Sequence, residues 1–392
     1  MFLWMAGGGT GGHVYPGLAV LEALRGLGPV DVLYVGGRGS VEERLAARAG
    51  LPFAGIPAGG LHGLAPWRAA RNLVKLALGV FTALRLGRRR RPDVLFVTGG
   101  YASVPVALAA WALRVPILLY LPDIEPGLAV RFIARLATRI GVTVEDSRAF
   151  LPACKVVVTG YPVRPEFAGI ERAAARAALG LPDGEPVLLA FGGSTGARSI
   201  NQAVVENLEV LLEVAHVVHI SGERDWPWVA ARADTLPAPA RGRYHPSPYL
   251  HGAAMGQALA DTLPAPARGR YHPYPYLHGA AMGQALAAAD LAVCRAGAST
   301  LGELPYFGLP AVLVPYPYAW RYQRVNAEWL ASRGAAVILE DARLKEELVP
   351  TVRSLLGDSA RLSEMRERAR ALARPDAAQR LAQLLVEIGG MP

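Results

Sequence analysis

The stretch that decides the fold is Gly8-Gly9-Thr10-Gly11-Gly12-His13, which follows a short apolar run, Phe2 to Ala6, and precedes a helix-like segment, Leu18 to Leu27. A glycine-rich turn between a strand and a helix lets backbone N–H groups approach a phosphate, and the helix dipole favours its charge. The spacing differs from the dinucleotide fingerprint and from the P-loop, so neither NAD nor ATP is indicated. The stretch predicts an anion-binding loop with one titratable side chain. The alternative is a plain tight turn with a solvated histidine.

Three further loops repeat this order of strand, glycine turn and helix. They are Gly99-Gly100-Tyr101-Ala102-Ser103 in the first half of the chain, and Gly192 to Arg198 and Arg295 to Glu303 in the second half. In doubly wound α/β sheets, ligands bind at the carboxyl ends of the strands, where all four loops are expected. Two loops in each half predict an α/β protein of two doubly wound, Rossmann-like domains facing a central cleft.

Composition supports this interpretation and excludes other classes. A chain of 392 residues suits two α/β domains, and a hydrophobic fraction of 52% with 19% charged residues excludes a disordered chain. The two cysteines lie far apart without a C-x-x-C, which indicates neither a disulfide framework nor a zinc site. No secretory leader precedes the first strand, so we expect a reducing compartment. The net charge of +9 comes without a nucleic-acid motif, so we expect no nucleic-acid partner.

Six motifs occur in an order that is shared with a known family. They are the four glycine-rich loops above, together with Gly160-Tyr161-Pro162-Val163-Arg164 and Gln323-x-x-Asn326-Ala327. The series resembles the MurG family, the undecaprenyldiphospho-muramoylpentapeptide β-N-acetylglucosaminyltransferases of glycosyltransferase family 28. The resemblance implies a GT-B architecture, with residues 1–161 and a helix at about 374–392 forming the acceptor and membrane domain. Residues 162–373 would bind UDP-GlcNAc.

The resemblance also implies a donor site. UDP-GlcNAc would contact Thr10, Gly11, Gly12, Arg164, Ser194, Leu277, Ala298, Ser299, Thr300, Glu303, Gln323 and Asn326. Arg164 would pair with the phosphates, Glu303 would hold the ribose hydroxyls, and Gln323 and Asn326 would face the sugar from one side of a helix. No Asp-x-Asp pair indicates a metal, so a helix N-terminus and an arginine would stabilise the leaving diphosphate. Each of these polar residues, taken alone, could instead be a cap or a surface group.

The acceptor site is implied in the first half. Gly8, Gly9, Gly99 and Gly100 would cradle the lipid diphosphate, lined by Tyr101 and Ser103. His13 is the general-base candidate because imidazole titrates near neutral pH, and a helix-capping histidine is the alternative. Where the family usually has His-Glu-Gln-Asn, this chain has Tyr120-Leu121-Pro122-Asp123. Asp123 would either orient His13 or act as the base.

The implied reaction is the inverting transfer of N-acetylglucosamine from UDP-GlcNAc to the MurNAc 4-hydroxyl of lipid I, which forms lipid II without a cofactor. Two alternatives stay open. One is a GT-B glycosyltransferase for another lipid acceptor, suggested by Tyr120-Leu121-Pro122-Asp123. The other is a UDP-GlcNAc epimerase, which shares the fold and the donor but needs no membrane helix.

A basic and apolar segment, Trp67 to Arg91, predicts a membrane-surface helix. At about 100° per residue, two adjoining apolar faces form beside a stripe of cations. One face contains Leu73, Leu76, Val80 and Leu84, and the other contains Trp67, Val74, Leu78 and Phe81. The stripe of cations contains Arg68, Arg71 and Lys75. Such a helix is typical of proteins that rest on an anionic bilayer, here at the cytoplasmic face. The alternative is an ordinary amphipathic helix. Glycines at 79 and 87 weaken the helix and leave its length open.

The apolar stretch from Ala102 to Pro122 contains Arg114 and three prolines, whereas a membrane span needs about 20 uninterrupted apolar residues. We predict a buried helix, Val104 to Leu113, and a buried strand, Ile117 to Leu121.

A tandem repeat interrupts the second half. Residues 234–260 and 261–287 are the same 27 residues except that Ser247 becomes Tyr274. By resemblance, the second copy occupies the family position and places Leu277 at the uracil pocket. The first copy is then predicted to be a surface insertion, which costs little loop entropy. The alternative is that the copies exchange roles.

Overall fold

The computed structural model describes residues 1–8, 11–59, 66–193, 196–236, 243–247, 280–318 and 321–390. Four predicted site residues, Gly9, Thr10, Ser194 and Leu277, lie outside these residues. The chain forms two compact units. Unit one is Met1–Arg164 with Arg374–Pro392, and unit two is Pro165–Ala373, so the chain leaves unit one once and returns to it.

Unit one contains a seven-stranded parallel sheet in the order β3-β2-β1-β4-β5-β6-β7. The strands are β1 (Phe2–Gly7), β2 (Asp31–Gly37), β3 (Phe53–Ile56), β4 (Val94–Gly99), β5 (Ile117–Leu121), β6 (Arg139–Val142) and β7 (Val156–Val158). The central strands β1, β4 and β5 are buried along their whole length, which is why they are continuous apolar runs.

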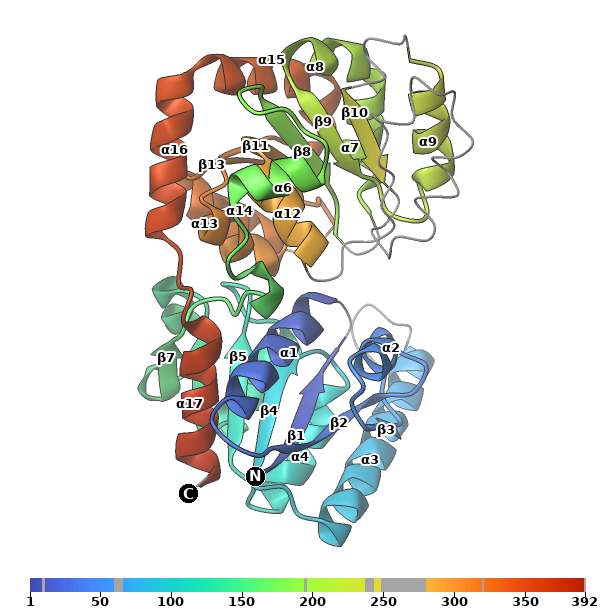
Figure 1. The fold of residues 1–392 in the computed structure, drawn as a ribbon. Helices are drawn as coiled ribbons and strands as arrows, with labels where there is room; N and C mark the ends of the chain where they lie inside the picture. Colours follow the sequence, from blue (N-terminus) through green and yellow to red (C-terminus); the bar gives the residue numbers. More distant parts are fainter. Residues whose placement is uncertain are drawn as a thin grey trace. The chain divides into compact units, whose positions relative to one another are not determined.

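Helices cover both faces of this sheet (Figure 1). One core lies under α1 (Gly11–Arg25), α2 (Val41–Arg48) and the C-terminal α17 (Ala377–Gly389), which lies beside α1. The other core lies under α4 (Ser103–Ala112) and α5 (Leu128–Leu136), and α3 (Pro66–Arg89) packs on α4. The predicted helix and strand between Ala102 and Pro122 are confirmed as α4 and β5.

Unit two contains a six-stranded parallel sheet in the order β10-β9-β8-β11-β12-β13. The strands are β8 (Val187–Phe191), β9 (His216–Ile220), β10 (Tyr244–Ser247), β11 (Leu291–Cys294), β12 (Ala311–Leu313) and β13 (Ala336–Ile338). Its helices are α6 (Arg172–Ala178), α7 (Arg198–Glu206), α8 (Leu208–Val214), α9 (Trp226–Asp234), α12 (Ala280–Ala288), α13 (Glu303–Phe307), α14 (Tyr322–Ser332), α15 (Leu344–Gly357) and α16 (Ser359–Ala371). The prediction of two doubly wound α/β domains is therefore confirmed.

The two copies of the repeat contribute different elements. The first copy supplies β10, which pairs in parallel with β9 at the edge of the sheet. The second copy supplies α12, which packs on α6. The prediction that the first copy is a surface insertion is wrong for Tyr244–Ser247, because these residues complete the sheet.

Helix α3 runs unbroken through both of its glycines. A Cβ on Gly79 would lie 2.4 Å from the Pro57 carbonyl oxygen, and one on Gly87 would lie 2.4 Å from Leu113 Cδ1. The glycines therefore lie where the helix approaches the rest of unit one too closely for a side chain. Among the residues that the structure describes, no helix is long and apolar enough to cross a membrane.

Candidate functional site

The two glycine loops of unit one interlock at the carboxyl edge of the sheet. They follow the neighbouring strands β1 and β4, and the Gly8 N–H donates to the Gly99 carbonyl at 3.2 Å. Gly100 has a φ of +87°, and a Cβ there would lie 2.5 Å from the Gly8 carbonyl oxygen. Only glycine fits this close approach of two backbones. The sheet thus brings together two of the predicted diphosphate loops.

His13 lies in the first turn of α1, beside this junction. Its Nδ1 is 2.8 Å from the Thr98 carbonyl oxygen, and the Thr98 hydroxyl donates to the His13 carbonyl at 2.6 Å. Because a carbonyl only accepts, Nδ1 carries the proton in the neutral ring, and Nε2 keeps its lone pair. The ring is therefore oriented as a base at Nε2.

Sequence reasoning missed Thr98. The group on Nδ1 of His13 is the Thr98 carbonyl, whereas the sequence suggests Asp123 as a possible orienting group. Asp123 is half-buried and follows β5, which neighbours β4, so it lies on the same edge of the sheet. The only available signal for Thr98 was its position directly before Gly99-Gly100. A role for Asp123 as the base stays a prediction.

Two buried side chains, Ser103 and Glu42, lie against the loops, whereas Tyr101 is exposed. Ser103 is fully buried and donates to the Gly99 carbonyl at 2.6 Å, whereas Tyr101 is 45% exposed. Glu42 of α2 is also buried, and a Cβ on Gly8 would lie 2.5 Å from its carboxylate oxygen. Sequence reasoning missed Glu42, because nothing local links α2 to the first loop.

The segment that departs from the family pattern is mostly core. The Tyr120 hydroxyl is 2.8 Å from the Thr143 hydroxyl and donates to the Gly160 carbonyl at 3.1 Å. Burial raises the pKa of Tyr120 far above its ordinary value. Leu121 and Pro122 are buried as well, so Asp123 is the one residue of the four with an accessible side chain.

Arg164 ends the first of the two segments that form unit one. Its guanidinium carbon lies 4.7 Å from the centre of the Tyr15 ring on α1, a cation–π contact. The sequence predicts a boundary after residue 161, which would place Arg164 in the UDP-GlcNAc domain. Its predicted pairing with the donor phosphates stays a prediction.

In unit two, side chains fasten the loops at the carboxyl edge. The Asn326 amide of α14 is fully buried and donates to the Ala296 carbonyl at 3.1 Å, in the loop after β11. The Gln323 amide oxygen accepts from the Tyr316 N–H at 2.9 Å, in the loop after β12. These two residues of one helix therefore hold two neighbouring loops. The predicted contact with the sugar stays a prediction, and the full burial of Asn326 favours a supporting role.

Arg295 connects loops at the same edge, a role that the sequence motif does not predict. It donates to the Val314 carbonyl at 3.2 Å and to the Ser199 hydroxyl at 2.7 Å, and it forms an ion pair with Asp341. These groups follow β12, begin α7 and follow β13. One partly buried guanidinium thus connects three segments of the edge.

The residues that are predicted to bind the ribose and the phosphate of the donor follow β11. Ala298, Ser299 and Thr300 form a short 3-10 helix, Ala298–Leu301, in which the Thr300 hydroxyl donates to the Gly297 carbonyl at 2.6 Å. Glu303 begins α13 and is 5% exposed. Burial, and then the nearby Glu303 carboxylate, raise the pKa of the Cys294 thiol. This thiol is therefore an inert part of the core.

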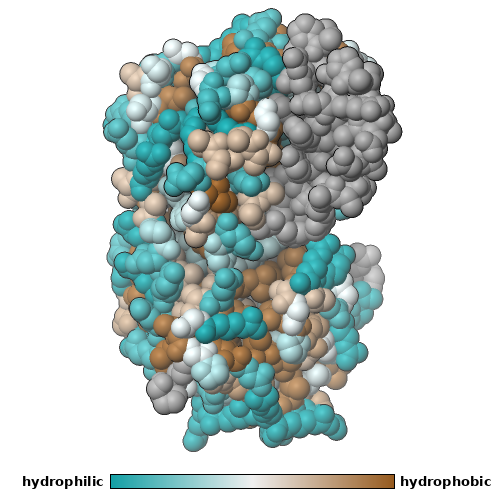
Figure 2. Space-filling model, viewed as in Figure 1, coloured by the Kyte–Doolittle hydropathy of each residue, from teal (hydrophilic) through white to brown (hydrophobic). Residues whose placement is uncertain are grey.

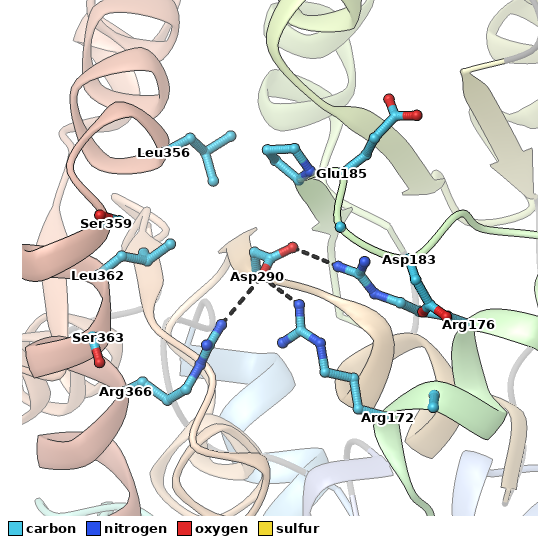
Figure 3. Close-up of a pocket in the computed structure, with 13 residues that line it drawn as sticks. Arg172, Arg176, Asp183, Glu185, Asp290, Leu356, Ser359, Leu362, Ser363 and Arg366 are labelled. Atoms are coloured by element: carbon cyan, nitrogen blue, oxygen red, sulfur yellow. Dashed lines mark hydrogen bonds and ion pairs between the residues drawn. The ribbon is translucent and has the colours of Figure 1, made fainter.

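A depression of about 500 Å³ lies at the opposite edge of this sheet, where β8 and β11 begin. Figure 3 shows three guanidinium groups, from Arg172, Arg176 and Arg366, converging on the Asp290 carboxylate. Burial, and then the neighbouring Arg172, lower the pKa of Arg366. The cluster ties α6 and α16 to β11, far along the strands from the predicted ligand loops, and we regard it as structural.

The outer face of α3 is apolar and basic. Its exposed apolar residues are Leu73, Val74, Leu78 and Phe81, each more than half exposed. Arg71 and Lys75 are exposed beside them. The side chains of Trp67 and Arg68 lie outside the described residues. Figure 2 shows apolar residues at the surface of unit one among hydrophilic ones.

Comparisons with known proteins give one family along the whole chain. Residues 3–142 match the glycosyltransferase family 28 N-terminal domain, and residues 255–381 match the family 28 C-terminal domain. A UDP-N-acetylglucosamine–N-acetylmuramyl-(pentapeptide) pyrophosphoryl-undecaprenol N-acetylglucosamine transferase from Roseiflexus sp. (strain RS-1) is 43% identical over 97% of this chain and 94% of its own. The protein of the same name from Desulforudis audaxviator is 39% identical over 98% of each chain.

Solved structures agree. The crystal structure of Acinetobacter baumannii MurG matches with a TM-score of 0.72 and 27% identity, over 98% of this chain and 99% of that one. The UDP-GlcNAc 2-epimerase from Neisseria meningitidis, bound to UDP-GlcNAc, matches with a TM-score of 0.59 over 99% of this chain and 100% of that one. Its identity of 12% means that this second likeness shows the fold alone.

Proposed function

This chain belongs to the family of UDP-N-acetylglucosamine–N-acetylmuramyl-(pentapeptide) pyrophosphoryl-undecaprenol N-acetylglucosamine transferases, and from that premise we propose that it makes lipid II from lipid I. It transfers N-acetylglucosamine from UDP-GlcNAc to the MurNAc 4-hydroxyl, with inversion at the sugar carbon. The observation that carries the proposal is the orientation of His13, whose Nδ1 is held by Thr98 beside two interlocked glycine loops.

We assign the reaction to the residues as follows. Nε2 of His13 takes the proton of the acceptor hydroxyl while the oxygen of that hydroxyl forms a bond to C1 of the donor sugar. The bond from C1 to the diphosphate oxygen breaks, and UDP leaves with the electron pair. Backbone N–H groups of the Gly192 to Gly196 loop and the Arg164 guanidinium stabilise the charge of the diphosphate. Glu303 holds the ribose hydroxyls, and Gly8, Gly99 and Gly100 border the acceptor diphosphate.

We further propose that unit one rests on the cytoplasmic face of the membrane through α3. Leu78 and Phe81 are exposed to solvent although both are large and apolar, and Arg71 and Lys75 lie beside them. An apolar strip bordered by cations suits the boundary between acyl chains and anionic headgroups. The lipid part of the acceptor lies in that membrane, so attachment brings unit one to its substrate.

The core position of Tyr120, Leu121 and Pro122 bears on the alternative of another lipid acceptor. Their replacement of the family pattern changes packing inside unit one, and Asp123 is left as the accessible difference. This argues for the same acceptor class with a changed residue, Asp123, at the same end of the sheet as His13. The epimerase alternative rests on fold alone, because the similar epimerase structure is 12% identical.

A transfer assay tests the proposal. Radiolabelled UDP-GlcNAc is incubated with a lipid I analogue, with other polyprenyl diphosphate sugars, and with no acceptor. We expect label in the lipid I analogue alone. Label only in another lipid supports the first alternative, and a sugar epimer formed from UDP-GlcNAc alone supports the second. Either outcome would overturn the proposal.

A further inference from the structure

We propose that Tyr244, in the first copy of the repeat, is a positioning residue for Gly196, the last glycine of the loop that begins at Gly192, and that it acts through His219 and Asn201. The inference rests on the proposed function only in assigning that loop to the UDP diphosphate. Its structural basis is a chain of buried polar side chains that the proposed reaction does not use.

The three side chains come from three elements. Tyr244 lies on β10, His219 on the neighbouring β9, and Asn201 on α7, which follows the loop. The Tyr244 hydroxyl is 2.7 Å from His219 Nδ1, and His219 Nε2 is 3.0 Å from Asn201 Oδ1. His219 and Asn201 are fully buried and Tyr244 is 1% exposed. Polar groups this deep need defined partners, because an unpaired one is costly.

The direction of each hydrogen bond follows from Asn201. Its amide nitrogen donates to the Ser221 carbonyl at 2.8 Å and to the Asp225 carboxylate at 2.9 Å. Both amide protons are then used, so Oδ1 accepts from His219 Nε2–H. His219 Nδ1 carries no proton and accepts from the Tyr244 hydroxyl. Burial lowers the pKa of His219 to about 3, so the ring is neutral at neutral pH and the order persists.

The series of hydrogen-bonded side chains ends at the glycine loop. A Cβ on Gly196 would lie 2.4 Å from the Ser221 carbonyl oxygen, and Gly196 has a φ of +78°. The Gly196 N–H donates to the Gly193 carbonyl at 2.8 Å, which closes the turn. Asn201 fixes the Ser221 carbonyl on which this turn packs. Arg198, the first residue of α7, forms a second connection through an ion pair of 3.3 Å with Asp225.

Removal of the Tyr244 hydroxyl leaves Nδ1 of His219 without its donor. The free energy of the buried ring then falls if the ring moves or changes its tautomer. In the tautomer with a proton on Nδ1, Nε2 has no proton, so the hydrogen bond to Asn201 Oδ1 is lost. A shift of Asn201 then moves the Ser221 carbonyl, against which Gly196 packs. The repeat offers a matched control, because Tyr271 occupies the equivalent place in the second copy, within otherwise identical sequence.

The experiment compares Tyr244→Phe with Tyr271→Phe in the full chain. Isothermal titration with UDP is expected to show binding about 3- to 10-fold weaker for Tyr244→Phe, the effect of one buried hydrogen bond. The Michaelis constant for UDP-GlcNAc should rise by the same factor, with kcat within about twofold. Tyr271→Phe should match the wild type. Unchanged UDP binding in Tyr244→Phe, or weaker binding in Tyr271→Phe, would overturn the assignment.

Hydrogen exchange at the Gly196 amide, measured by NMR without ligand, separates this inference from the proposed function. Tyr244→Phe should speed exchange at Gly196, whereas Tyr271→Phe should not. His219→Gln keeps a donor toward Asn201 and should exchange more slowly there than His219→Leu. If the wild-type protein binds no UDP, but exchange at Gly196 still speeds up in Tyr244→Phe, the proposed function is contradicted and this inference is not. Exchange at Gly196 that is the same in wild type and Tyr244→Phe contradicts the relay.

Discussion

The two units present glycine loops at the carboxyl edges of parallel sheets, but they hold these loops differently. In unit one, the loops contact each other through their backbones: the Gly8 N–H donates to the Gly99 carbonyl, and Gly100 packs closely against Gly8. In unit two, polar side chains bond to the loops, for example those of the buried Asn326 and the partly buried Arg295. The same topology therefore has two weaknesses. The loop junction of unit one is sensitive to a Cβ added at Gly100, and the loops held by Asn326 and Arg295 in unit two are sensitive to the loss of a polar side chain.

The largest expected effect separates the chemistry of unit one from donor binding in unit two. His13→Ala should lower kcat by a factor of about 10² or more, because a positioned base contributes about 10² to 10⁴. UDP binding, measured by titration, should barely change. Asp123→Asn should cost less if Asp123 only assists. A nearly silent His13→Ala beside a damaging Asp123→Asn would transfer the role of base to Asp123.

Gly100→Ala tests the backbone contact of unit one. A φ of +87° and a contact of 2.5 Å together should reduce the free energy of unfolding by about 1 to 3 kcal/mol or more, and transfer should fall with it. Urea unfolding measures the loss. Gly39→Ala is the control, because Gly39 also has a positive φ but nothing lies within 4 Å of its Cβ position. Equal losses would mean that the contact with Gly8 is unimportant.

Glu303→Ala tests dependence on a side chain in unit two. We expect about 1 to 3 kcal/mol in donor binding, seen as a higher Michaelis constant for UDP-GlcNAc at nearly constant kcat. The exposed Glu346 at the start of α15 provides a control, Glu346→Ala. A donor constant that is unchanged by Glu303→Ala would remove Glu303 from the ribose site.

Membrane attachment should depend on unit one alone. The pair Arg71→Glu and Lys75→Glu should weaken binding to anionic vesicles at least tenfold, since each basic residue near such a surface contributes about 1 kcal/mol. Flotation of vesicles measures this. Arg25→Glu with Arg44→Glu makes the same charge change on other exposed helix positions of unit one. Equal losses from both pairs would point to net charge rather than to α3.

The smallest expected effect near neutral pH comes from His219. Its folded pKa of about 3 lies below its ordinary value of 6.5, so the unfolded chain binds the extra proton first. Stability is therefore complete above about pH 6.5 and falls as the pH drops toward 3, by at most about 1.4 kcal/mol per pH unit. His219→Gln should show a shallower fall of unfolding free energy. The same slope in both proteins would contradict a buried neutral ring.

The sequence predicted the features that depend on local pattern. The apolar runs and glycine turns were enough to predict two α/β domains with glycine loops after their strands. The hydrogen bond of Thr98 to His13 could not be predicted, because it uses a backbone carbonyl 85 residues away. Arg295 and Asn326 were recognised as motif residues, but their bonds depend on how loops after separate strands meet.

The repeat shows a different limit. Two nearly identical copies have the same local preferences, so the sequence offers no reason to prefer one of them for β10. The strand position is decided by tertiary contacts. Tyr244 is buried there and bonds to His219, and the first copy reaches β9 through the short connection after α9.

The return of the chain to unit one has an architectural consequence. The chain departs after Arg164 and resumes at Arg374, and within unit one these crossings lie close together, since a Cβ on Gly160 would lie 2.4 Å from Arg374 Cβ. Unit two is thus a domain inserted into a closed host. A short linker could bridge the two crossing points, and the host should still complete its own core through α17. Unit two is therefore one continuous segment that can be removed or exchanged as a whole without any other cut in unit one.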